Sequence, residues 1–140
     1  MTIEITNDDL KAIELFESLT GAQVADIYIG ENTVAFTVKE GDLGKAIGKK
    51  GANITRVRAA FGRQVLVFEE SQIIEQYIRN LFGQVPIRNI NIHEKMNTKT
   101  AYVTVDGKDR GSAIGRGGDR IKVVRALLLR KFNCDLSLKS

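Results

Sequence analysis

The chain begins with apolar residues at helical spacing. They are Leu10, Ile13, Phe16 and Leu19. The segment Thr6-Asn7-Asp8-Asp9, just before them, has the spacing of a capping box, and Gly21 is placed to end a helix. We therefore predict the first helix between these two signals.

The period of the pattern then changes from helical to strand-like. Segments 24–29 and 33–38 are predicted strands joined at 30–32. In the second of them, Val34, Phe36 and Val38 alternate with smaller or more polar residues, the pattern of a half-buried strand. The remaining elements are predicted in this order: a short helix over 42–47, a glycine break at 48–51, a helix from Ala52 to Gly62, and a strand over 65–68.

The second half of the chain repeats this order of elements. Ser71 is a candidate cap for a helix whose apolar positions run from Ile74 to Phe82 and which Gly83 ends. The later elements are strands over 87–92 and 100–105 with a turn at 95–98, a short helix over 109–114, a glycine break at 115–118, a helix presenting Ile121, Val124 and Leu128, and a strand over 134–138. Each half is thus predicted as helix–strand–strand–helix–loop–helix–strand.

The two halves share sequence as well as pattern. The segment 44–51, GKAIGKKG, returns 67 residues later as GSAIGRGG at 111–118. Over the wider stretch 37–59, 12 of 23 positions are identical to 104–126. We therefore predict an α+β protein of two tandem domains, 1–70 and 71–140, each with a three-stranded sheet covered by helices, and the boundary near Glu69-Glu70-Ser71.

The charged residues are unevenly distributed, and the basic ones are concentrated around the two glycine segments. The net charge is only +4, but residues 1–70 carry 8 Lys and Arg against 11 Asp and Glu, and residues 71–140 carry 13 against 6. Residues 42–63 hold six basic residues against Asp42 alone, and residues 108–131 hold eight against Asp109 and Asp119. Positive charge focused on both glycine segments indicates an anionic partner, above all a polyanion.

Most enzymatic functions find no support in the sequence. One cysteine, Cys134, and one histidine, His93, are too few for a usual zinc site or an internal disulfide, and we expect both residues to be structural. Neither glycine segment has the spacing of a Walker loop or a dinucleotide fingerprint. We expect no catalytic residue, metal, cofactor or small-molecule substrate. Without a membrane-length apolar stretch or a signal-peptide pattern, we expect a cytoplasmic protein that binds no membrane.

The glycine segments have the chemistry of phosphate binding. Glycine at both ends of Gly-x-x-Gly permits positive φ and lets a sugar-phosphate backbone approach the main chain. The helix that follows directs its free N–H groups and positive dipole end to the same place. Ile47 and Ile114, just before the loops, belong either to the core or to an apolar groove for bases. The plainer alternative is that each loop is only a tight turn between helices.

An Ile-Gly-x-x-Gly turn between two helices, after a strand and before a closing strand, resembles the KH RNA-binding domain. Because a helix and a strand come first in each half, the prokaryotic (type II) arrangement of that fold is implied. A pair of such domains covering nearly the whole chain is most similar to the archaeal NusA-like transcription termination/antitermination proteins.

The resemblance and the basic residues together give the predicted RNA-binding set. It comprises the loops Gly48, Lys49, Lys50, Gly51 and Gly115, Arg116, Gly117, Gly118, the nearby cations Lys45, Arg56, Arg58, Arg120, Lys122 and Arg125, and the apolar Ile47 and Ile114. Gly117 stands where many such loops carry a polar or basic residue, and Arg120, Lys122 and Arg125 are expected to compensate for it.

The predicted function is non-catalytic binding of single-stranded RNA, the nascent transcript, in transcription termination or antitermination. RNA polymerase or other transcription factors are further candidate partners. One alternative is a KH adaptor in ribosome maturation or RNA degradation. An alternative of another class is a protein-interaction scaffold that keeps its loops as turns and uses, for example, its acidic N-terminal helix for docking.

Overall fold

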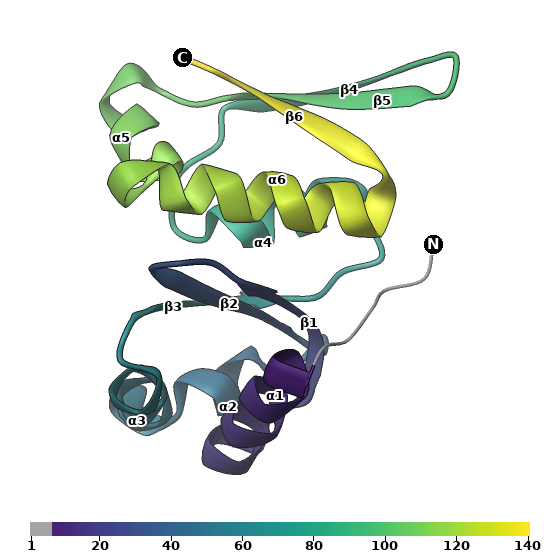
Figure 1. Cartoon of the computed structure of the whole chain (residues 1–140). Helices are drawn as coiled ribbons and strands as arrows, with labels where there is room; N and C mark the ends of the chain where they lie inside the picture. Colours follow the sequence, from purple (N-terminus) through teal and green to yellow (C-terminus); the bar gives the residue numbers. More distant parts are fainter. Residues whose placement is uncertain (1–6) are drawn as a thin grey trace. The chain divides into compact units, whose positions relative to one another are not determined.

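A computed structural model describes residues 7–140 (Figure 1). The predicted capping box begins at Thr6, which lies outside the described residues. The chain divides into two compact units, one up to Glu70 and the other from Ser71 to Ser140. Each unit has its own sheet and its own helices, and each is described by itself below.

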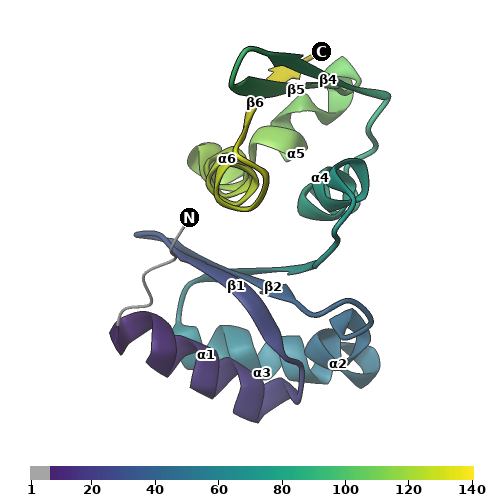
Figure 2. The same ribbon diagram turned by 90° about the vertical axis from the view of Figure 1, so that its right-hand side faces the viewer.

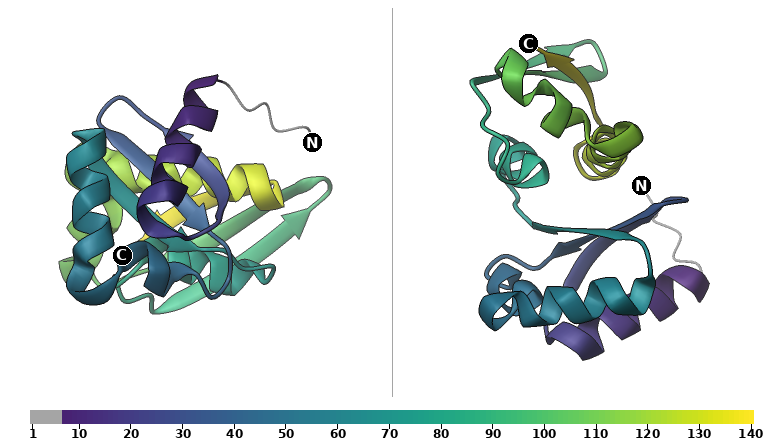
Figure 3. Two further views of the ribbon diagram at one scale, coloured as in Figure 1. Left: turned by 90° about the horizontal axis from the view of Figure 1, so that it is seen from below. Right: turned by 90° about the vertical axis from the view of Figure 1, so that its left-hand side faces the viewer.

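The first unit has the predicted order of elements. They are α1 (Asn7–Thr20), β1 (Val24–Ile29), β2 (Thr33–Val38), α2 (Leu43–Ile47), α3 (Ala52–Phe61) and β3 (Gln64–Glu69). The sheet order is β1-β2-β3, with β1 and β2 antiparallel and β2 and β3 parallel. A parallel pair needs a crossover connection, and α2 and α3 provide it. All three helices lie on one side of the sheet (Figures 2 and 3).

The core of the first unit lies between the sheet and these helices. Phe16 of α1 stacks on Phe36 of β2 with ring centroids 4.1 Å apart, and both side chains are fully buried. The prediction of a half-buried β2 was wrong, because all six of its positions are buried. On the face away from the helices, the register sets Tyr28 and Leu66 on either side of Ala35. A small side chain in the central strand thus stands between two larger ones.

The second unit has the same topology. Its elements are α4 (Ile74–Phe82), β4 (Asn89–Lys95), β5 (Thr98–Thr104), α5 (Arg110–Ile114), α6 (Asp119–Phe132) and β6 (Cys134–Lys139). The sheet order is β4-β5-β6, again antiparallel and then parallel. Helix α6 has 14 residues and its counterpart α3 has 10, so α6 is about one turn longer. The predicted α+β fold of two tandem KH-type domains is confirmed.

Two local predictions in the second unit were wrong. Ser71 does not cap α4, whose N-cap is Ile73 with no side-chain cap. The Ser71 hydroxyl instead accepts a hydrogen bond from the Ile73 N–H and donates one to the Ile73 carbonyl, so it shapes the turn before the helix. The first strand starts at Asn89 rather than at 87, and Arg88 before it pairs with Asp106 at 2.7 Å.

Buried apolar side chains of α4, α6 and the sheet form the core of the second unit. Tyr77, Leu127, Leu128, Val103 and Val124 are fully buried. Ile121, predicted on the same face, is only half-buried. Cys134 is buried at the start of β6 and packs there as a small apolar residue. Burial raises the pKa of its thiol above the ordinary value.

Candidate nucleic-acid interface

The first loop, Gly48–Gly51, is a tight turn between α2 and α3. The Gly48 N–H donates to the Gly44 carbonyl at 2.8 Å and ends α2, and the Gly51 N–H donates to the Gly48 carbonyl at 3.1 Å. Gly48 has φ 76° and ψ 171°, a combination accessible essentially only to glycine. The loop is therefore closed by its own backbone hydrogen bonds.

Close packing is a second reason for glycine at the start of the loop. A Cβ atom at Gly48 would lie 2.7 Å from Cγ and 2.8 Å from the backbone N of Asn53. Asn53 is held in place because its Nδ2 donates to the Lys45 carbonyl at 2.8 Å. The main chain at Gly48 thus lies against the first turn of α3, and a side chain has no room there.

The second loop, Gly115–Gly118, repeats this geometry. Gly115 has φ 82° and ψ 173°, and its N–H donates to the Gly111 carbonyl at 2.9 Å. The Gly118 N–H donates to the Gly115 carbonyl at 3.1 Å, as in the first loop. A Cβ atom at Gly115 would lie 2.7 Å from Cβ and 2.8 Å from the backbone N of Arg120. The sequence repeat is therefore also a repeat of loop structure.

The loops differ at their third residue, which is left-handed in both. Lys50 has φ 54° and ψ 28°, and Gly117 has φ 60° and ψ 20°. A non-glycine residue in this conformation costs roughly 1–2 kcal/mol. In the first loop, Lys50 has this conformational cost and adds a cation. In the second loop, Gly117 has neither the cost nor the charge. The departure noted in the sequence thus has a backbone explanation.

Gly117→Lys is therefore expected to lower the folding stability and to strengthen anion binding. No atom lies within 4 Å of a Cβ at Gly117, so the cost is conformational only, about 1 kcal/mol after the lower entropy of the unfolded chain is counted. The added cation is expected to make the log–log salt dependence of RNA binding steeper by roughly 0.7. Urea unfolding and RNA titrations measure the two effects, and Lys50→Gly is the reciprocal control. A stability gain for Gly117→Lys would contradict the backbone explanation.

Each loop leads into a helix whose first N–H groups have no side-chain cap. The N-caps are Gly51 for α3 and Gly118 for α6, and neither helix has a side-chain cap hydrogen bond. The N–H groups of Ala52 and Asp119 already donate to the Lys49 and Arg116 carbonyls. The remaining N–H groups of each first turn and the positive dipole end of each helix face the region of the loops. Phosphate oxygens are suitable partners for such groups.

Most of the predicted cations lie exposed near the loops. The exposed side chains are Lys45, Lys49, Lys50, Arg56 and Arg58 in the first unit, and Arg116, Lys122 and Arg125 in the second. Lys45 Nζ lies 3.8 Å from Asp42 Oδ1, and Arg56 Nη1 lies 3.5 Å from Asn53 Oδ1. The first contact is an exposed ion pair and the second a long hydrogen bond to a neutral amide. Exposed ion pairs contribute little to stability, so these cations remain available to an anionic ligand.

Arg120 occupies a different place from the other predicted contacts. It is half-buried, and its Nη1 donates to the Leu81 carbonyl at 3.0 Å, in the last turn of α4. Burial lowers the pKa of its guanidinium. Arg120 thus holds the C-terminal end of α4 against the start of α6, where a cation also interacts favourably with the helix dipole. This position corresponds to Asn53 in the first unit, which ties α3 to α2.

The two isoleucines before the loops are not core residues. Ile47 is 41% exposed, and Ile114 is half-buried. The neighbouring Ala46 and Ala113 are fully buried instead. Of the two places left open for Ile47 and Ile114, the structure favours the surface beside each loop.

Sequence reasoning missed a hollow along one edge of the second unit. It is lined by Arg125, Ala126 and Leu129 of α6 and by Asp135 and Leu136 of β6, with a volume of about 470 Å³. Leu129 is 45% exposed and lies in the last turn of α6. This residue belongs to the turn by which α6 is longer than α3. Comparing the lengths of the two helices predicted from the sequence is therefore the signal that could have revealed the hollow.

Other kinds of site find no support in residues 7–140. This part of the chain has no cluster of three or more His, Cys, Asp or Glu residues that could hold a metal ion. Nor does any helix within the same range have the length and apolar character needed to cross a bilayer.

Comparisons with known proteins agree with this architecture. The KH domain family matches residues 12–78. A probable transcription termination protein NusA from Halococcus morrhuae is 33% identical over 135 residues, 96% of each chain. The protein with that name from Methanococcus vannielii is 35% identical over 121 residues, 86% of this chain and 70% of that one. The crystal structure of APE1850 is similar with a TM-score of 0.80 and 35% identity, over 96% of this chain and 100% of that one.

The KH match runs from the middle of α1 to the middle of α4 and so covers most of the first unit, and the second unit has the same strand order and the same loop. The similarity to the NusA relatives extends over both units. The chain therefore has two tandem KH domains and belongs to the family of archaeal NusA-like proteins.

Proposed function

We propose that the chain binds single-stranded RNA without catalysing a reaction, and that each Gly-x-x-Gly loop clamps the RNA backbone. The observation that carries the proposal is the repeated geometry of the loops. Both combine a backbone conformation that only glycine reaches, an uncapped helix N-terminus and exposed cations. A plain helix–helix turn needs none of the cations, whereas a phosphate clamp uses all three features.

Backbone contact fixes where the RNA lies, and base contact has to supply any sequence preference. The hollow between α6 and β6 supports a base site in the second domain, because an apolar floor of Ala126, Leu129 and Leu136 is flanked by Arg125 and Asp135. Neither charged side chain forms an ion pair or a side-chain hydrogen bond with another residue in the described part of the chain. The Arg125 guanidinium is thus available to the edge of a base, whereas the Asp135 carboxylate lies on the other face of the strand, opposite Thr100.

The proposed contacts are the loop residues 48–51 and 115–118 with the exposed cations and isoleucines beside them. Arg120 is left out of this set, because its guanidinium already bonds to α4. The first domain contributes more loop cations, Lys49 and Lys50, and the second contributes more cations along its helix, including Lys122 and Arg125.

The proposed role is in transcription termination or antitermination, in the cytoplasm, with the nascent transcript as ligand. It is supported by the shared name of the relatives, probable transcription termination protein NusA. RNA polymerase and other transcription factors are the proposed protein partners. Affinity purification of the chain from cells is expected to recover polymerase and nascent transcripts. Recovery of pre-ribosomal particles or RNA-degrading enzymes instead would indicate an adaptor role.

Direct titration tests RNA binding itself. We expect the wild-type chain to bind an unstructured, fluorescently labelled RNA, with anisotropy rising to saturation. Its log–log salt slope is expected to be about −0.7 for each phosphate neutralised. Lack of binding at low salt by a folded wild-type chain would reject the proposal and favour a protein scaffold.

A further inference from the structure

The second domain has an open sheet face that the proposed RNA contacts do not use. The helices of this unit lie on one side of its sheet, and within residues 71–140 no helix or strand covers the other side (Figures 1 and 2). The strands place a row of side chains on this outer face: Asn91, His93 and Lys95 of β4, Thr98, Thr100 and Tyr102 of β5, and Asp135, Ser137 and Lys139 of β6.

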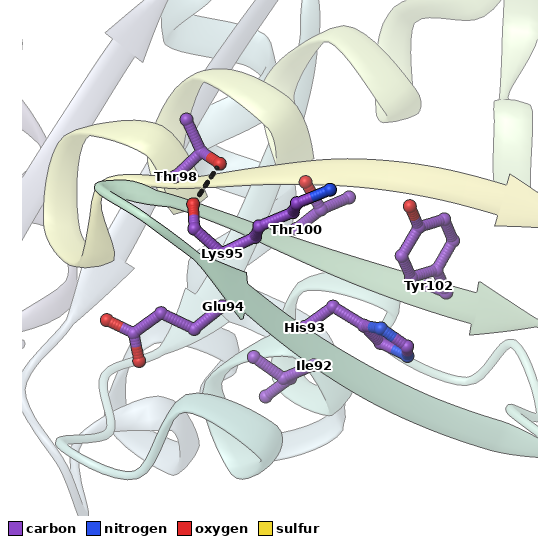
Figure 4. A pocket seen from close by; sticks show the side chains of 7 residues that line it. All are labelled: Ile92, His93, Glu94, Lys95, Thr98, Thr100 and Tyr102. Atoms are coloured by element: carbon purple, nitrogen blue, oxygen red, sulfur yellow. Dashed lines mark hydrogen bonds between the residues drawn. The ribbon is translucent and has the colours of Figure 1, made fainter.

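A hollow of about 510 Å³ lies over β4 and β5 on this face (Figure 4). Two aromatic rings form part of its lining. His93 meets Tyr102 edge to face, with centroids 5.2 Å apart and an interplanar angle of 79°. Thr98 Oγ1 donates to the Lys95 carbonyl at 2.8 Å and closes the hairpin beside them. The rings are therefore held on paired strands rather than on a mobile loop.

Cations accompany the rings. Lys139 Nζ lies 4.9 Å from the centroid of the Tyr102 ring, and Lys95 lines the hollow. Glu94 also lines it, but its carboxylate points away from the two rings (Figure 4). Asp135 pairs with Thr100 and is the acidic side chain of the face itself. The domain as a whole carries 13 basic against 6 acidic residues, so an anionic chain is attracted to it.

The outer face is connected to the loop region through α5. Arg110 Nη1 donates to Ser140 Oγ at 3.2 Å and so joins the first residue of α5 to the residue after Lys139. The second loop begins directly after α5, at Gly115. Arg110 is exposed and thus offers a cation between this loop and the end of β6, and Lys108 two residues before it is exposed as well.

We propose that the outer face of the second domain, centred on Tyr102 and His93, is a stacking platform for a base of the same single-stranded RNA. The proposal rests on RNA binding by the loops and adds a second site to it. A base stacks on Tyr102, and Lys139 moves from the ring to a phosphate. The first domain differs here, because the repeat places Ala35 where the second domain has Tyr102, and its outer face carries an aromatic ring on β1 instead, Tyr28.

A base is expected to replace Lys139 on the Tyr102 ring, because base stacking is stronger than the cation–π contact. A cation–π contact at an exposed site changes an equilibrium by about two- to fivefold. Stacking of a base on an aromatic side chain changes it by roughly 5- to 150-fold. The ammonium group loses the smaller interaction and gains a phosphate in its place. RNA binding is therefore expected to move Lys139 away from the ring rather than to be blocked by it.

The only histidine of the chain is a direct reporter of this site. We expect the imidazole NMR signals of His93 to shift and saturate when the full chain is titrated with an unstructured RNA of about twelve nucleotides, three times the four that one loop clamps. Tyr102→Ala is expected to weaken binding by roughly 5- to 100-fold without changing the salt slope, since stacking neutralises no phosphate. Tyr102→Phe, the matched control, keeps the ring and is expected to bind like the wild type.

The possible results separate this site from the loops. Unchanged His93 signals at saturating RNA, or wild-type affinity of folded Tyr102→Ala, would overturn the platform and leave loop binding in place. A shallower salt slope in Tyr102→Ala would also contradict stacking, because it would indicate a lost phosphate contact. If the wild-type chain binds no RNA, both the platform and the proposed function are rejected. A His93 shift that persists at higher RNA concentration in loop variants would support two distinct sites.

Discussion

Reversing the charge of both loops is expected to abolish measurable binding of single-stranded RNA at physiological salt. In Lys49→Asp/Lys50→Asp, two cations beside an uncapped helix N-terminus become anions that repel phosphate. A hydrogen bond to a charged group contributes about 1.5–3 kcal/mol, so losing two lowers the affinity by roughly 100-fold or more. Arg116→Asp/Gly117→Asp removes one cation and adds two anions at the second loop, so its loss of affinity is expected to be in the same direction and smaller. Fluorescence anisotropy across a salt series measures both, alone and combined.

These variants are expected to stay folded, because the substituted positions are exposed and aspartate tolerates the left-handed conformation of Lys50 and Gly117 better than most residues. Circular dichroism checks this expectation. Lys11→Asp/Lys39→Asp is a matched control for the first loop, since it makes the same change in net charge at exposed positions elsewhere in that unit. Equal loss of affinity in control and loop variants would mean that general charge, not the loop, determines binding.

Alanine at the first glycine of either loop is expected to destabilise the domain that carries it by about 2–4 kcal/mol. At Gly48 and Gly115, φ and ψ lie in a region that costs alanine about 1–3 kcal/mol, and a Cβ 2.7 Å from a side-chain carbon adds a steric term. A 70-residue domain has a total stability of only about 4–10 kcal/mol. Urea unfolding followed by NMR signals from each domain shows which one loses stability.

The same segments contain glycines for which the opposite result is expected. Gly44 and Gly111 lie inside α2 and α5, where an added Cβ would meet nothing within 4 Å. Because alanine is the better helix former, Gly44→Ala and Gly111→Ala are expected to stabilise by about 0.5–1 kcal/mol. If all four substitutions destabilised equally, the special conformation of Gly48 and Gly115 would not be the cause.

The architecture of each domain was predictable because local signals agreed with one another. Segments 24–29 and 33–38 coincide with β1 and β2 to the residue, since alternation and glycine breaks define strands well. The repeat made every assignment in one half support the corresponding assignment in the other. Two glycine segments in equivalent positions also pointed to the loops before any geometry was known.

What the sequence could not provide depends on contacts between distant segments. Arg120 was counted among the RNA contacts because of its charge, yet the carbonyl it bonds belongs to Leu81, 39 residues earlier in the chain. His93 and Tyr102 are in contact because the β4–β5 register makes them diagonal neighbours on adjacent strands. Similarly, the hollow beside Leu129 requires the position of β6 relative to α6.

The parallel strand that closes each sheet is also the last element of its domain. Strand β2 needs β3 at its free edge, and β5 needs β6, each after an intervening pair of helices. During synthesis, neither sheet can be completed until the end of its own domain has left the ribosome, and such non-local pairing is slow to form. Because β3 ends at Glu69, the first domain can fold while the second is still being translated. Co-translational folding is thus expected in two steps, one for each domain.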